Sequence, residues 1–123
     1  MSVEFLTLDD LLDLASAMGV PHVRDMGLLE SARLRPQTVL YGVETYPLIA
    51  EKAATYLESI VRNHPLLDGN KRLGWASAVT FLALNGEYLA TNDDDAFEFV
   101  VGIAAGEVNF EAIVEWIESR LKV

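Results

Sequence analysis

The chain has 123 residues, no cysteine and a net charge of −10, with a pI near 4.4. Such a length suits one domain, over residues 1–123, that buries about two thirds of its unfolded surface without metal or disulfide support. The acidic balance argues against a nucleic-acid ligand, because phosphate backbones are bound by basic surfaces. The absence of cysteine excludes disulfides and thiolate chemistry.

Targeting signals are not apparent in the sequence. Residues 1–5 lack the basic region followed by an apolar core that marks a secretion signal. No apolar run approaches the roughly 20 residues that cross a bilayer. We therefore expect a soluble, cytoplasmic protein that does not contact membranes.

Helix signals dominate the first half of the chain. Thr7, with Asp10 three residues later, is typical of a capping box, and apolar residues then recur on one helical face until Gly19. A second helix is expected from about residue 25 to residue 35, because Pro36 breaks the pattern. Residues 37–46 are rich in β-branched and aromatic side chains, which predicts one short extended segment.

The second half is also helical. Pro47 suits the first turn of a helix that runs to about residue 63. Residues 70–85 are apolar or small at nearly every position, which predicts a helix buried on most sides. The acidic residues 93–95 favour a helix start over a cation site, and Asn109 is expected to cap the last helix. The sequence thus predicts an all-α bundle of about six helices with one extended flap.

Reactive side chains gather in residues 64–72, His-Pro-Leu-Leu-Asp-Gly-Asn-Lys-Arg. His64 offers a base, since an imidazole ordinarily has a pKa near 6.5. Asp68 offers oxygen ligands for Mg²⁺. A turn through Gly69 into a helix would aim backbone N–H groups at an anion, beside the cations of Lys71 and Arg72. This set suits transfer of a phosphorus group to a hydroxyl.

Positive charge is scarce in this chain but concentrated near the motif. Of the nine Lys and Arg residues, three lie within residues 62–72: Arg62, Lys71 and Arg72. We expect this cluster to attract a small anionic ligand, with Asn70 as a further donor to a phosphate oxygen.

The motif resembles that of the Fic/Doc superfamily, whose signature is His-x-Phe-x-(Asp/Glu)-(Gly/Ala)-Asn-x-Arg. The matching residues are His64, Asp68, Gly69, Asn70 and Arg72. Fic adenylyltransferases usually carry Gly at the position of Lys71 and a second Arg at that of Trp75, so these two residues resemble the Doc ("death on curing") toxin branch. Residues 24–32 and the chain length also look like Doc.

The resemblance implies a role for each motif residue. His64 would activate a hydroxyl of a target protein, and Asp68 would coordinate Mg²⁺. The phosphates of ATP would be bound by Gly69, Asn70, Lys71 and Arg72. Doc-type members are protein kinases that transfer the γ-phosphate of ATP to translation elongation factor Tu, which arrests growth. The target would dock on the flap by adding a strand beside Val39, Leu40 and Tyr41.

The resemblance also implies control by a partner. Self-restraining Fic proteins carry a Glu before Gly or Asn in an inhibitory helix, and no Glu of this chain precedes either residue. A Phd-like antitoxin is therefore expected to supply the restraint. Leu66 departs from the family's aromatic residue but should still insert the loop into the core.

Several alternatives remain open from the sequence. The enzyme could transfer AMP to a protein hydroxyl instead of phosphate, or the chain could be a catalytically silent binding module. The flap could equally be an ordinary loop that covers the bundle. The aromatic residues of the helical runs are expected to be core residues rather than stacking surfaces for a ligand: Tyr56, Trp75 and Phe81.

Overall fold

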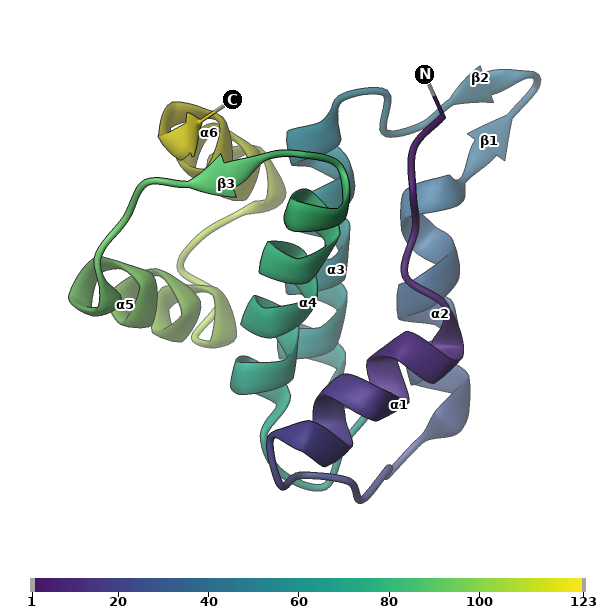
Figure 1. Cartoon of the computed structure of the whole chain (residues 1–123), viewed down its shortest axis with the longest axis vertical. Helices are drawn as coiled ribbons and strands as arrows, with labels where there is room; N and C mark the ends of the chain where they lie inside the picture. The colour runs from purple at the N-terminus through teal and green to yellow at the C-terminus, as the bar shows by residue number, and fades with distance from the viewer. Residues whose placement is uncertain (1, 123) are drawn as a thin grey trace.

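The computed structural model describes residues 2–122 and contains six α-helices within that range. Their bounds are α1 Leu8–Ala17, α2 Met26–Leu34, α3 Ile49–Asn63, α4 Asn70–Leu84, α5 Asp93–Ala104 and α6 Phe110–Arg120. A 3₁₀ turn, η1 Arg35–Gln37, follows α2, and short strands form two antiparallel pairs. The predicted all-α class is confirmed (Figure 1).

Polar caps begin the helices close to where the sequence predicts them. The backbone N–H of Asp10 donates to the hydroxyl of Thr7 at 3.0 Å, and the N–H of Thr7 donates to the Asp10 carboxylate at 2.8 Å. This reciprocal pair is the predicted capping box. The side chains at the starts of three further helices accept in the same way from a backbone N–H three residues on: Asp25, Asn92 and Asn109.

Helix α3 begins later than expected. The prediction that Pro47 lies in its first turn is wrong, because Leu48 has an extended backbone and serves as the N-cap. Leu48 provides no side-chain cap, but its own N–H donates to the Glu51 carboxylate at 2.9 Å. Ile49 is consequently the first helical residue.

Helices α3 and α4 lie side by side and antiparallel at the centre of the bundle (Figure 1). Gly74 permits this approach, since a Cβ there would lie 2.6 Å from Cγ2 of Val61. Tyr56 and Phe81 are fully buried between the helices, with ring centroids 5.1 Å apart. Their predicted place in the core is confirmed.

The more buried of the two central helices is α3, in which ten residues are buried. The prediction that α4 is covered on most sides is only partly right. Val79 and Leu84 of α4 are 37% and 50% exposed. An apolar run alone did not reveal which face was covered.

The predicted extended segment forms a hairpin of two short strands, β1 Val39–Leu40 and β2 Val43–Glu44. Its turn contains Tyr41 and Gly42, both with positive φ. Every residue of β1 and β2 is exposed. Lys52 of α3 is only 2% exposed and anchors the hairpin, since its ammonium donates to the Glu44 carboxylate at 3.3 Å and to the carbonyl of Tyr46.

A second strand pair was not predicted. Strand β3, Tyr88–Leu89, pairs antiparallel with β4, Leu121–Lys122. Two-residue strands are too short for an alternating pattern to show in the sequence. Within residues 2–122, no helix combines the length and apolar character needed to cross a membrane.

Candidate active site

The motif loop joins α3 to α4 at one end of the central helix pair, where the α1–α2 loop also passes (Figure 1). His64 is the C-cap of α3 and is exposed. Its φ of 54° and ψ of 59° are left-handed, a conformation that costs a residue with a Cβ about 1–2 kcal/mol. Helices usually place glycine there. The neighbouring structure must therefore impose this conformation on His64.

Leu66 and Asn70 close the motif loop. The Oδ1 of Asn70 accepts from the backbone N–H of Leu66 at 2.9 Å, and its Nδ2 donates to the carbonyl of Leu66 at 3.0 Å. Leu66 is 1% exposed, so its predicted insertion into the core is confirmed. The Asn70 side chain is 8% exposed and holds the loop, which leaves its backbone N–H as its better placed phosphate donor.

Gly69 makes the turn into α4. Its φ of +85° is left-handed, and an added Cβ would lie 2.6 Å from Cγ1 of Val20 in the α1–α2 loop. The N–H of Gly69 donates to Oδ1 of Asp68 at 2.8 Å. Glycine is therefore required at this position both by backbone conformation and by space.

Asp68 and Arg72 form a solvent-accessible ion pair of the motif, and Lys71 is exposed as well. The side chains of the pair are 91% and 58% exposed, and Oδ2 of Asp68 lies 3.9 Å from Nη2 of Arg72. An exposed ion pair of this length contributes little stability. Both groups are consequently free to exchange this contact for a metal ion or a phosphate.

A cavity of about 460 Å³ lies between the start of α4 and helix α5. Five consecutive motif residues form one side of it, Asp68 to Arg72. His64 is not among the described residues that line the cavity. The structure therefore gathers the predicted phosphate and metal residues around one space and places the predicted base at the other end of the loop.

The opposite side of the cavity is mostly apolar, and the sequence did not reveal it. Trp75 of α4 lines the cavity and forms a T-shaped pair with Trp116, with ring centroids 6.1 Å apart. Its prediction as a core residue is thus only partly right. Phe97 of α5 lines the cavity and is 67% exposed. The remaining lining residues come from α5: Asp93, Ala96, Val100 and Val101.

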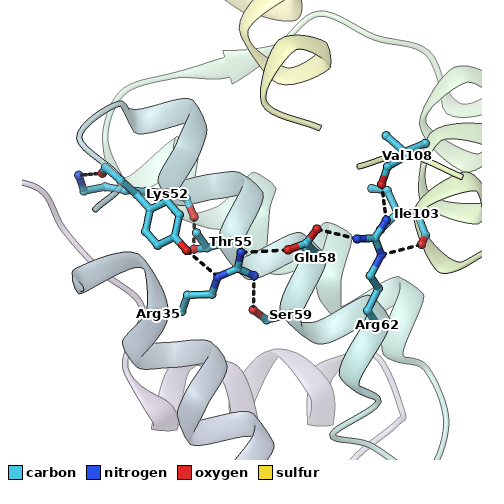
Figure 2. Close-up of polar contacts among 9 residues, drawn as sticks. Arg35, Lys52, Thr55, Glu58, Ser59, Arg62, Ile103 and Val108 are labelled. Atoms are coloured by element: carbon cyan, nitrogen blue, oxygen red, sulfur yellow. Dashed lines mark hydrogen bonds and ion pairs between the residues drawn. The ribbon is translucent and has the colours of Figure 1, made fainter. Parts of the chain in front are cut away.

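Arg62 does not join the motif cations, and this expectation is wrong. Figure 2 shows its guanidinium directed to Glu58 and to the carbonyl groups of Ile103 and Val108. Its Nη1 lies 2.7 Å from Oε2 of Glu58, and its Nε donates to the Ile103 carbonyl at 3.1 Å. Arg62 therefore links α3 to the last turn of α5 and to the α5–α6 loop, in which Val108 lies.

The β1–β2 hairpin lies at the opposite end of α3 from the motif loop (Figure 1). A helix of 15 residues is about 22 Å long. The structure therefore does not bring Val39, Leu40 and Tyr41 to His64. These side chains are nevertheless 55%, 58% and 104% exposed, so a partner could contact them.

Comparison with known proteins identifies the family of this chain. A model of the Fic/DOC family matches residues 5–82, more than half of the chain. The chain belongs to the Fic/DOC family. It is 50% identical over 93 residues to "Toxin Doc" of Mycolicibacterium smegmatis, covering 74% of this chain and 72% of that protein. It is 33% identical over 97 residues to "Protein kinase doc" of Escherichia phage P1, covering 79% and 75% of the two chains.

The Fic/DOC match contains the whole motif and ends within α4. Both relatives carry the name Doc, which confirms the branch that Lys71 and Trp75 predicted. The α5 wall of the cavity lies beyond the matched segment.

Proposed function

We propose that this chain is a Doc-like toxin: a protein kinase that transfers the γ-phosphate of ATP to a Ser or Thr hydroxyl of a translation factor, of the elongation factor Tu class, and so arrests growth. The cavity that joins five motif residues to an apolar wall carries this proposal. The names of the two relatives, "Toxin Doc" and "Protein kinase doc", support it.

The start of α4 would bind the phosphates of ATP. The first N–H groups of a helix have no partner within it, and the helix dipole favours an anion there. The N–H groups of Asn70, Lys71 and Arg72 occupy these positions. The exposed side chains of Lys71 and Arg72 add two positive charges. Trp75 and Phe97 would cover the base of the nucleotide on the apolar side of the cavity.

Asp68 would hold Mg²⁺ together with the phosphates. Its Oδ1 accepts from Gly69, while its carboxylate is 91% exposed and can offer Oδ2. Mg²⁺ usually takes one or two carboxylates and completes its shell with waters and phosphate oxygens. Residues 2–122 contain no cluster of three or more metal-ligating side chains, which suits a metal that binds with ATP. When bound, Mg²⁺ neutralises the charge of the phosphates.

His64 would accept the proton of the target hydroxyl. The hydroxyl oxygen then bonds to the γ-phosphorus, while the bond from that phosphorus to the β–γ bridging oxygen breaks and ADP leaves. Because His64 is exposed and does not line the cavity, it can meet a hydroxyl presented by a protein.

Two partners complete the proposal. Val39, Leu40 and Tyr41 would dock the target by strand addition at a distance from the reacting hydroxyl. A Phd-like antitoxin would silence the toxin, and an exposed apolar side chain such as Phe97 offers the surface that a segment folding on binding needs.

Labelled ATP tests the reaction. Wild type, His64→Ala and the control His22→Ala, which alters the other exposed histidine, are incubated with a target extract and with γ-labelled or α-labelled ATP. We expect only the γ label to reach protein, and His64→Ala to lose about 10²–10⁴-fold in rate while His22→Ala does not. Transfer of the α label alone would replace the kinase by AMP transfer. Equal transfer by His64→Ala would refute its role as base, and no transfer would favour a silent binding module.

A further inference from the structure

We infer that Arg24 is a positioning residue, which holds the backbone of His64 in the left-handed conformation from which the imidazole accepts a proton. The inference rests on the proposed role of His64 as base. Arg24 lies in the α1–α2 loop, 40 positions before His64 in the sequence. No sequence pattern links the two residues, and the fold alone brings them together.

The guanidinium of Arg24 caps the end of α3. Its Nε donates to the carbonyl of His64 at 2.7 Å, and its Nη2 donates to the carbonyl of Asn63 at 2.9 Å. The last carbonyls of a helix have no partner within it and carry the negative end of the dipole. A cation that donates to two of them makes charge-assisted hydrogen bonds. These bonds offset the unfavourable backbone conformation of His64.

The backbone around Arg24 braces the rest of the motif loop. The N–H groups of Arg24 and Asp25 both donate to the carbonyl of Pro65, at 2.8 and 3.0 Å. Val23 forms an antiparallel bridge with Leu66. Residues 22–25 therefore run beside the loop and are joined to it by an isolated β-bridge and backbone hydrogen bonds. This backbone attachment does not depend on the Arg24 side chain, so losing the guanidinium should release His64 without detaching the loop.

The bonds of Arg24 also argue against a role in binding phosphate. Arg24 is not among the described residues that line the cavity, and Nε and Nη2 are occupied by the helix end. Lysine could replace only one of the two bonds, because it lacks the planar fork of arginine. Removal of Arg24 is therefore expected to change the turnover number and not the affinity for ATP.

Three variants test the inference. Arg24→Met keeps the length of the side chain but removes its donors, and Arg24→Lys keeps one charge. Arg120→Met is the matched control, because Arg120 also donates to a helix carbonyl, that of Trp116 at 3.4 Å, near the end of α6. Each protein is measured for kcat and KM with ATP, for unfolding in urea, and for the φ of His64 in a crystal structure.

We expect Arg24→Met to lower kcat by about 10–100-fold, since small misplacements of a reacting group have effects of this size. The KM for ATP should stay within about twofold. Arg24→Lys should be intermediate, and Arg120→Met should keep the wild-type kcat. In Arg24→Met the φ of His64 should leave the left-handed region or become heterogeneous. Arg24→Met should have no further effect on kcat in a His64→Ala background, because the two residues act through one group.

Three results would overturn the inference: an unchanged His64 backbone in Arg24→Met, a raised KM for ATP at constant kcat, or an equal slowing by Arg24→Met in the His64→Ala background. A failure of the proposed function would look different. Wild type would then transfer no γ-phosphate, and the His64 conformation in Arg24→Met would still decide whether Arg24 positions it.

Discussion

Replacing Gly69 by alanine should destabilise the fold more than the same change at Gly86, although both glycines have positive φ, of 85° and 79°. The left-handed backbone alone costs alanine about 1–2 kcal/mol. At Gly69 the new Cβ would also lie 2.6 and 2.8 Å from the two methyl groups of Val20, whereas at Gly86 it meets no described atom within 4 Å. Val20 is only 7% exposed and cannot turn into solvent. Overpacking adds about 1–3 kcal/mol.

Urea unfolding, followed by circular dichroism, measures this difference. We expect Gly69→Ala to lose about 2–5 kcal/mol of unfolding free energy and Gly86→Ala about 1–2 kcal/mol. Val20→Ala removes both methyl groups, so Gly69→Ala should cost less in that background. If Gly69→Ala and Gly86→Ala differ by less than about 0.5 kcal/mol, the close approach of the α1–α2 loop to the motif turn is refuted.

The variants Gly69→Ala and Gly86→Ala also distinguish a loss of stability from a loss of function. Gly69 is the N-cap of α4, while Gly86 follows the other end of that helix. A strained turn at Gly69 would shift the N–H groups proposed to bind phosphate. Under conditions in which both variants are folded, Gly69→Ala should therefore lose γ-phosphate transfer and Gly86→Ala should keep it.

Burial raises the pKa of Tyr56 to about 12. The neutral phenol therefore contributes about 2–3 kcal/mol of unfolding free energy, which is complete below pH 10 and is lost as the pH rises toward 12. Tyr56→Phe should flatten the dependence of the unfolding free energy on pH in this alkaline range, and an unchanged slope of that dependence would contradict the prediction. Leu66→Ala should cost about 2–5 kcal/mol in urea unfolding because Leu66 is 1% exposed. The neighbouring control Leu67→Ala, at a side chain 68% exposed, should cost less than about 0.5 kcal/mol. Asp68→Asn should raise the Mg²⁺ concentration that phosphate transfer requires, as measured by titration with Mg²⁺ after chelation. If Asp93→Asn raised this Mg²⁺ concentration equally, the metal would lie elsewhere.

Local signals in the sequence predicted the helix starts well, apart from that of α3. The caps at Thr7 and Asn109 depend on hydrogen bonds to a backbone group three residues away, so the necessary information lies within one turn. The motif itself is equally local, since its nine residues form one loop and the first turn of α4. The insertion of Leu66 was predicted differently, from the aromatic residue that the family motif has at this position.

Contacts between distant segments could not be predicted in this way. The apolar wall of the cavity requires α5 to pack across α4, and Phe97 carries no signal of that in its own neighbourhood. Arg62 lies two positions before His64 in the sequence, yet its side chain is directed to the carbonyls of Ile103 in α5 and Val108 in the α5–α6 loop (Figure 2). Arg24 shows the converse, because it reaches the motif loop only in the folded chain. Closeness in the sequence therefore gave a wrong expectation for Arg62, and separation in the sequence hid the contact that Arg24 makes with the motif loop.

The fold divides the motif into a fixed backbone and movable charges. Asn70 bonds both polar backbone groups of Leu66, and Gly69 packs against Val20, so the turn has its shape before a ligand arrives. The exposed side chains of Asp68 and Arg72 are joined to each other by a contact of 3.9 Å, worth at most about 1 kcal/mol. Rearranging the site would therefore cost little of the free energy of nucleotide binding. Only this ion pair must open, because the turn is already ordered before the nucleotide binds.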